Sequence, residues 1–226
     1  MKVTKQPPVK GHPQSHGKMF DNPLLEFLSK SNPTVTFITY GSIISTYIVL
    51  NYLYGPISNI GQGIALYLGG LFFWTFAEYF LHRYLFHWIT EHPFVQRFHY
   101  SVHGYHHEFP RDDTRVFMPP IPGLVLSTLF LGIFYLIMGT YAFLFAAGFI
   151  NGYLIYSTVH YSTHKFKPPK SKWLKTLWRH HNLHHYRFPD KAFGVSSPIW
   201  DYVFGTMPPM PKKRTKKVAN KAVGAS

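Results

Sequence analysis

The sequence predicts an all-α fold in which about four transmembrane helices form two hairpins, with a polar helical cap on their cytoplasmic side. Two long blocks, 34–81 and 116–164, contain no lysine or arginine, so all 23 of these residues lie outside them. Aromatic residues make up 19% of the chain and charged residues only 14%, an unusual balance for a soluble domain. Ten of the 15 histidines fall into four short clusters at the block ends or in the polar segments.

The composition also limits the class of protein. A chain of 226 residues is expected to form one domain, here over 19–210, between a flexible basic tail at 1–18 and a basic disordered tail at 211–226. No cysteine is present, which excludes disulfides and thiolate metal sites. The N-terminal residues lack the apolar segment of a signal peptide. The net charge of +14 borders the apolar blocks, which argues against a nucleic-acid partner.

The first block predicts a helical hairpin. Residues 34–54 carry no charge, and as a helix they would span about 30 Å, the thickness of a bilayer core. A Gly-Pro pair with polar neighbours predicts a turn at 55–59, and 60–81 forms a second span in which Glu78 is the only charged residue. Glycines in this span would let helices approach closely. They are Gly61, Gly63, Gly69 and Gly70.

The second block predicts another hairpin, with spans at about 121–138 and 140–160. Both turns lack lysine and arginine, whereas the N-terminus, the middle segment 82–120 and the C-terminal third contain all of them. Because positive charge stays on the cytoplasmic side, both termini and the histidine clusters are expected there, at the endoplasmic reticulum of a eukaryote or the inner membrane of a bacterium. A soluble protein with two buried hairpins is the alternative, but charge-free runs of this length are rare in soluble cores.

A short amphipathic helix is expected before the first span, within 19–33. Asp21 or Asn22 would cap it, and Pro23 suits its first turn. Its apolar side chains fit an ordinary surface helix and an interfacial helix equally well, so both interpretations stay open.

The clustered histidines have the spacing of metal ligands. Two copies of the pattern H-x2-HH place three imidazoles on one helical face, since positions i, i+3 and i+4 lie together. A pair four residues apart also fits one face, but a pair five apart requires the helix to fray or bend. The four clusters are His82 and His87; His103, His106 and His107; His160 and His164; and His181, His184 and His185.

Ten imidazoles exceed the needs of one metal ion, which takes about four to six ligands, so the sequence predicts a histidine-rich dimetal site. Only a redox metal activates dioxygen, so two iron ions are expected, with zinc able to replace them in a purified sample. No catalytic residue is predicted beyond the metal ligands. Nearby polar groups could orient the ligand rings by accepting their second N–H. The candidates are Glu78, Glu108, Asp112, Asp113 and His180.

With these motifs in view, the chain resembles the fatty acid hydroxylase / sterol desaturase superfamily of membrane di-iron oxygenases. The order H-x4-H, H-x2-HH, H-x3-H, H-x2-HH is that of the superfamily. Residues 103–120, which end in Pro119-Pro120, are similar to the first double-histidine region of the fatty acid 2-hydroxylases. The stretch 193–197 with Trp200-Asp201-Tyr202 is similar to the segment after their last cluster. The resemblance covers about 19–207.

The resemblance implies that the ten clustered histidines bind the two metals of a membrane-bound hydroxylase domain. It implies that O2 is a co-substrate and that a fatty acyl chain is hydroxylated at the 2-position, as a free fatty acid, an acyl-CoA or a sphingolipid acyl chain. Eukaryotic members often carry an N-terminal haem domain. Only about thirty residues precede the first span here, so a separate electron-donor protein is expected, a reductase with a haem or ferredoxin carrier.

Related activities remain as alternatives. A histidine-box lipid desaturase, or a sterol or carotenoid oxygenase, could use similar ligands, although acyl desaturases usually show three clusters. A metal transporter or metal-binding protein is a more distant alternative. It would need polar ligands inside the spans, whereas almost all clustered histidines lie at span ends or in polar segments.

Overall fold

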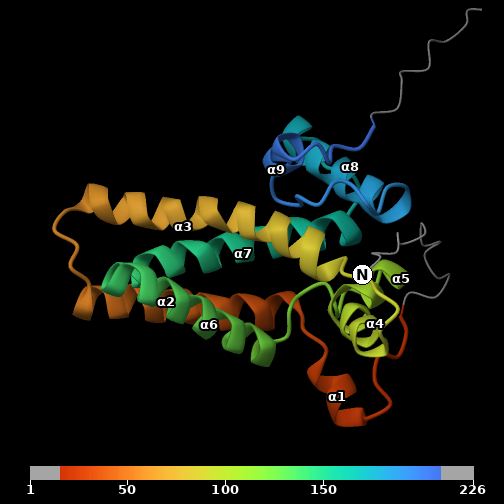
Figure 1. The fold of residues 1–226 in the computed structure, drawn as a ribbon, viewed down its shortest axis with the longest axis horizontal. Helices are drawn as coiled ribbons and strands as arrows, with labels where there is room; N and C mark the ends of the chain where they lie inside the picture. Colours follow the sequence, from red (N-terminus) through yellow and green to blue (C-terminus); the bar gives the residue numbers. More distant parts are fainter. Residues whose placement is uncertain (1–15, 210–226) are drawn as a thin grey trace, which may run out of the picture.

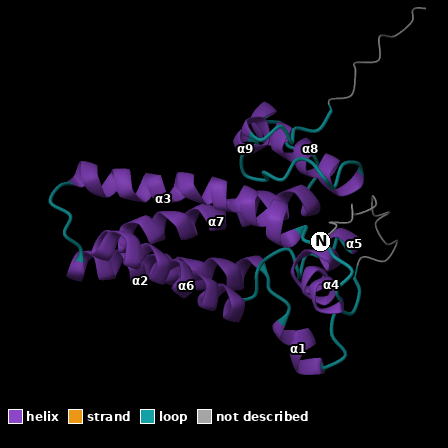
Figure 2. Cartoon of the chain, viewed as in Figure 1, coloured by secondary structure: helices purple, strands orange, loops and turns teal. Residues whose placement is uncertain are grey.

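The computed structural model describes residues 16–209, and within that range every regular element is a helix (Figure 2). Four long helices lie side by side along the longest axis of the molecule, and most of the short helices gather at one end of them (Figure 1). The predicted all-α class is therefore confirmed. Most of the two predicted tails, 1–18 and 211–226, lies outside the described residues.

The long helices follow the predicted blocks. The first hairpin consists of α2 (Pro33–Tyr54) and α3 (Ile60–Phe80), so its turn lies where it was predicted. Helix α3 continues directly into a π-helical segment, η1 (Leu81–Phe86). The second block contains α6 (Pro120–Met138), the 3-10 turn η3 (Gly139–Tyr141) and α7 (Ala142–Lys165).

The short helices carry most of the histidines that lie outside the long helices. They are α4 (Pro93–His99), the π-helical η2 (Tyr100–Gly104), α5 (Tyr105–Glu108), α8 (Lys172–Tyr186) and α9 (Ile199–Val203). A further short helix, α1 (Pro23–Leu28), precedes the first hairpin.

Asparagine side chains cap the N-termini of three of the helices. At α1, Asn22 accepts hydrogen bonds from the amides of Leu24 and Leu25, and Pro23 occupies the first turn, as predicted. Asn32 caps α2 and Asn59 caps α3 in the same way. Because a helix leaves its first N–H groups without partners, such caps define where each helix starts.

Helices α3 and α7 cross in backbone contact. A Cβ atom added to Gly70 would lie 1.9 Å from the carbonyl oxygen of Phe145, and one added to Gly148 would lie 1.9 Å from that of Tyr67. Glycine is therefore required on both helices at this crossing. The contact brings the C-terminal end of α3, which continues into η1 with His82, and that of α7, which carries His160 and His164, to the same end of the molecule.

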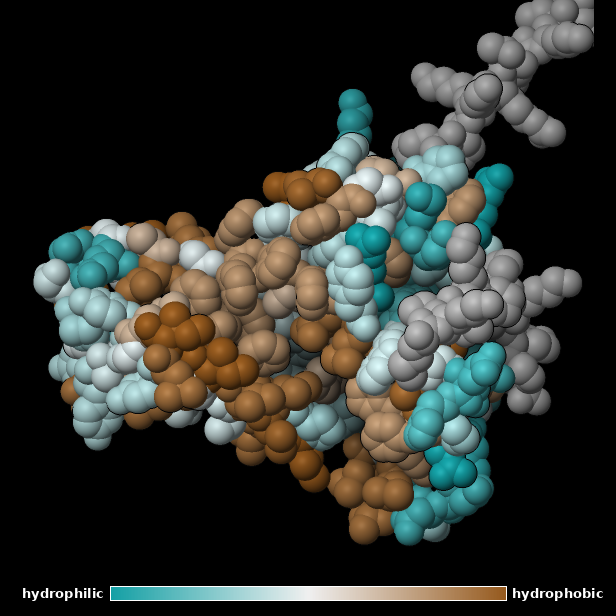
Figure 3. All heavy atoms as spheres, in the orientation of Figure 1, coloured by the Kyte–Doolittle hydropathy of each residue, from teal (hydrophilic) through white to brown (hydrophobic). Residues whose placement is uncertain are grey.

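The surface of the long helices is apolar. Three helical stretches are long and apolar enough to cross a membrane: Pro33–Tyr54, Ile60–Phe86 and Pro120–Lys165. The third covers α6, η3 and α7. The ring centroids of Phe134 on α6 and Phe149 on α7 lie 5.2 Å apart, so the two helices pack against each other. Hydrophobic side chains cover much of these helices, whereas hydrophilic ones gather where the short helices lie (Figure 3). Leu136 keeps 87% of its surface exposed, which fits contact with lipid better than with water.

Candidate metal centre

The ten clustered histidines converge and divide into two groups of five. Within each group one nitrogen of every ring lies within 4.8 Å of those of the other four. His87 and His164 are half-buried and the other eight are buried. Group one contains His82, His87, His103, His107 and His184. Group two contains His106, His160, His164, His181 and His185.

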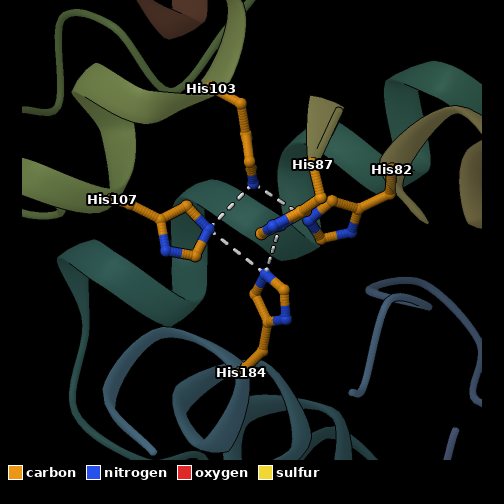
Figure 4. A group of neighbouring side chains, drawn as sticks. All are labelled: His82, His87, His103, His107 and His184. Carbon is orange, nitrogen blue, oxygen red and sulfur yellow. Dashed lines mark hydrogen bonds between the residues drawn. The ribbon is translucent and has the colours of Figure 1, made fainter. Parts of the chain in front are cut away.

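The rings of group one point toward one another (Figure 4). The Nε2 atom of His103 lies 3.0 Å from that of His82 and 2.9 Å from that of His107. The Nε2 atom of His184 lies 3.2 Å from that of His107 and 3.0 Å from that of His87. Metal–nitrogen bonds of about 2.1 Å place neighbouring ligands at right angles about 3.0 Å apart. The spacing of these nitrogen atoms therefore fits a single metal ion.

Group two shows the same need for a cation. The Nε2 atoms of His164 and His181 lie 2.9 Å apart. Both ring nitrogens of His106, His160 and His185 are buried without a hydrogen-bond partner among the described residues. Leaving such polar atoms unpaired in the interior costs free energy. A metal ion bound by one nitrogen of each ring would reduce that cost, so the donor set fits a second ion.

Each H-x2-HH motif contributes to both groups. His103 and His107 lie in group one, whereas His106 between them lies in group two. In the second copy the roles are reversed, since His181 and His185 lie in group two and His184 lies in group one. The two motifs therefore interlock, and neither group is built from consecutive clusters alone.

A π-helical turn allows His82 and His87, which are five residues apart, to lie in the same group. The amide of His87 donates to the carbonyl of His82 at 3.2 Å, five residues back, which is the bond of a π-helix. The wider turn brings both rings into group one. The departure from a regular α-helix that the spacing of this pair requires is therefore present, as a π-helical segment. A second π-helical segment, η2, contains His103.

Burial keeps the imidazoles neutral. It lowers the pKa of His106 from 6.5 to about 3. Burial, aided by neighbouring histidines, also holds the pKa well below the ordinary value in His103, His107, His181, His184 and His185. Neutral imidazole is the form that binds metal, so these nitrogens are available at neutral pH.

Two of the ten clustered histidine rings are held by backbone carbonyls. The Nδ1 atom of His82 donates to the carbonyl of Phe193 at 2.6 Å, and that of His184 donates to the carbonyl of Lys191 at 2.7 Å. Glu78 accepts from the amides of Val195 and Ser196 in the same loop. The structure thus places Glu78 of α3 against this loop, where it accepts from two backbone amides and from the hydroxyl of Ser196.

The other polar candidates contact neighbouring side chains. His180 bonds Asp201 at 3.0 Å, and Asp112 bonds the Tyr105 hydroxyl at 2.6 Å. Asp113 pairs with Lys165, and Glu108 hydrogen-bonds Tyr100. Sequence motifs alone indicated neither Asp201 nor the carbonyls of residues 191 and 193 as part of the site. A backbone acceptor leaves no trace in the sequence, but a single aspartate in the otherwise apolar stretch 198–204 is a usable signal.

Comparison with known proteins gives consistent matches. The family model described as "Fatty acid hydroxylase" matches residues 67–206. Over 149 residues the chain is 35% identical to fatty acid 2-hydroxylase of Mus musculus, covering 65% of this chain and 40% of that protein. It is 38% identical over 152 residues to dihydroceramide fatty acyl 2-hydroxylase FAH1 of Arabidopsis thaliana, covering 66% of this chain and 63% of that protein.

A solved structure agrees with these matches. The hydroxylase domain of scs7p superposes with a TM-score of 0.75 at 31% identity, covering 84% of this chain and 71% of that chain. The aligned region spans less than half of the mouse protein and under two thirds of the plant protein. The family match includes all ten clustered histidines and covers more than half of the sequence. The chain belongs to the fatty acid hydroxylase family.

Proposed function

We propose that this chain is a membrane di-iron monooxygenase that hydroxylates a fatty acyl chain at the 2-position. The observation that carries the proposal is the convergence of ten histidines into two groups whose inner nitrogens have the spacing of metal ligands. The names of its relatives, fatty acid 2-hydroxylase and dihydroceramide fatty acyl 2-hydroxylase, support the acyl substrate and the position. The substrate would be a free fatty acid, an acyl-CoA or a sphingolipid acyl chain.

Two bound iron ions would supply the activation of dioxygen that an unactivated C–H bond requires. The residues of the chain hold and orient this centre. Five imidazoles serve each group, and their burial keeps water from competing for the site. The carbonyls of Lys191 and Phe193 keep a proton on Nδ1 of His184 and His82, which leaves their Nε2 lone pairs free for metal.

The reaction balances as R–H + O2 + 2 e⁻ + 2 H⁺ → R–OH + H2O. One oxygen atom enters the substrate and the other leaves as water, so the electrons must come from outside the substrate. We assign them to a separate electron-donor protein, a reductase with a haem or ferredoxin carrier.

The proposed topology has four spans, α2, α3, α6 and α7, with both termini and the histidine groups in the cytoplasm. The antiparallel packing of α6 on α7 supports it, as does the absence of lysine and arginine from 34–81 and 116–164. His82 lies just beyond α3, and His160 lies in the last two turns of α7. An acyl chain that enters between these helices would bring its carboxyl end to the metal groups.

Mass spectrometry of total fatty acids tests the proposal. Cells that produce the protein together with a compatible electron donor would be compared with cells that produce His106→Ala. A gain of one oxygen at the carbon beside the carboxyl, lost in the variant, is the expected result. A histidine-dependent double bond instead would identify a desaturase, and oxygen at another carbon would change the position.

A further inference from the structure

The loop 191–197 fixes two ligands of group one. A carbonyl oxygen can only accept a hydrogen bond, so His82 and His184 must each carry their proton on Nδ1, facing Phe193 and Lys191. In a neutral imidazole this leaves the Nε2 lone pair facing the other rings of the group. The loop therefore determines both the tautomer and the direction of these two ligands.

Asp201, at the third position of α9, holds one part of this loop. Its Oδ1 accepts from the amide of Phe193 at 3.0 Å and from the Thr206 hydroxyl at 2.6 Å. Its Oδ2 accepts from the amide of Gly194 at 2.8 Å and from Nε2 of His180 at 3.0 Å. The carboxylate is fully buried, with an exposed fraction of 0%. Four donors thus converge on a group that has no contact with solvent.

Glu78, on α3, holds the other part of the loop. Its carboxylate accepts from the amide of Val195, the amide of Ser196 at 2.9 Å and the hydroxyl of Ser196. Between the two carbonyls, Ala192 has a φ of 61°, which is uncommon for a residue other than glycine. The hydrogen bond of its amide to the carbonyl of Thr206 at 2.9 Å holds it there. The loop conformation is therefore imposed by its anchors.

Within the described part of the chain, group two has no such support from the loop. Both ring nitrogens of His106, His160 and His185 lack a hydrogen-bond partner in residues 16–209, and so does Nδ1 of His181. The loop carbonyls reach rings of group one only. A disturbance of the loop should consequently affect one metal and spare the other.

We propose that Asp201 and Glu78 are positioning residues that hold the loop 191–197 against His82 and His184, and so set the metal affinity of group one separately from that of group two. This inference rests on the proposed two-metal site. It assigns a role to two buried carboxylates that do not touch the metal positions themselves.

Metal content of the purified protein tests it. Asp201→Asn keeps the shape of the side chain but turns its NH2 group toward one of the two backbone amides, Phe193 or Gly194, that donate to the carboxylate. Group-one affinity should fall by about 10- to 100-fold, the usual effect of losing a group that orients a ligand. Under a matched free-metal buffer of Zn²⁺, measured by plasma mass spectrometry, the bound metal should fall from two ions per chain to one. Glu78→Gln, at the other anchor, should have the same effect.

Asp112→Asn is the matched control, because Asp112 is equally buried but bonds Tyr105 and Arg115 and not the loop. It should keep two ions. The inference is overturned if both loop variants retain two ions at wild-type affinity, or if they lose both ions in parallel. If one loop variant does not fold, the other decides. A wild-type protein that binds no metal would overturn the proposed function, and this inference with it.

Discussion

His106 and His184 each belong to a different histidine group from the other two histidines of their own H-x2-HH motif. His103 and His107 lie in group one, whereas His106 packs against His185 of group two, with ring centroids 4.7 Å apart. His184 leaves its own motif and places Nε2 3.2 Å from that of His107 in group one. Each group thus depends on one ring supplied by the other motif, which ties α5 to α8 through both metal positions.

Alanine at either position should abolish hydroxylation. We expect His106→Ala and His184→Ala each to lower activity by at least about 100-fold, since each removes a direct ligand. Both variants should still insert into the membrane, as a carbonate-extraction assay would show. Removal of residues 212–226, which lie outside the described residues, should have a much smaller effect. Full activity in both histidine variants would refute the dimetal interpretation.

The metal-free protein should lose stability in acid. The folded state holds the pKa of His106 at about 3, against 6.5 in the unfolded chain, because burial disfavours the charged ring. Below 6.5 the unfolded chain therefore binds a proton that the folded chain refuses, and stability falls as the pH drops toward 3. Thermal unfolding of chelator-treated protein at about pH 7.5 and about pH 5 measures this. A melting temperature that rises in acid would contradict it.

Arg115 should stabilise the contact between α1 and the histidine region. It pairs with Glu26 of α1 and bonds Asp112 and Tyr105, each at 2.8 Å. Arg115→Ala would remove the guanidinium from the buried Asp112 and leave Glu26 with Lys30 alone, and it should lower the free energy of unfolding by about 3–5 kcal/mol.

The control for this prediction is Lys30→Ala. Lys30 also contacts Glu26, at 3.3 Å, but 45% of its side chain is exposed. Lys30→Ala should lower the free energy of unfolding by only about 0–1 kcal/mol. Equal losses in the two variants, measured by thermal unfolding, would show that Arg115 has no special role.

Single cysteines can test the topology, because the natural chain has none. In the four-span arrangement Ser58→Cys and Thr140→Cys lie on one side of the membrane and Ser171→Cys lies on the other. A membrane-impermeant maleimide applied to sealed vesicles of known orientation should therefore label Ser58→Cys and Thr140→Cys from the same side of the membrane. It should label Ser171→Cys only from the opposite side. If 120–165 crossed the bilayer as one tilted stretch, Thr140→Cys would be shielded from both sides.

The sequence was sufficient to predict the four long helices and the meeting of the histidine clusters. Apolar blocks of bilayer length without lysine or arginine locate α2, α3, α6 and α7, and the spacing of His82 and His87 required the helix distortion that η1 provides. These features depend on local composition and on the period of a helix, which a sequence contains directly.

The partition of the ligands could not be predicted in this way. His103, His106 and His107 share a helical face by spacing, yet they serve two groups, because the groups lie so close that neighbouring rings on one face reach different centres. Glu78 was expected near the ligand rings, but its contacts with the loop 191–197 depend on packing between segments more than 110 residues apart. Long-range packing of this kind decides which rings are oriented, and no local pattern records it.

Isotope labelling of oxygen tests the central claim most directly. Membranes containing the protein and an electron donor would be supplied with fatty acyl substrate under ¹⁸O2 in ordinary water, and the product analysed by mass spectrometry beside the His106→Ala variant. We predict a 2-hydroxy acyl product whose new oxygen is ¹⁸O and whose formation requires His106. A product that carries oxygen from water, or that forms equally in the variant, would contradict a dimetal monooxygenase.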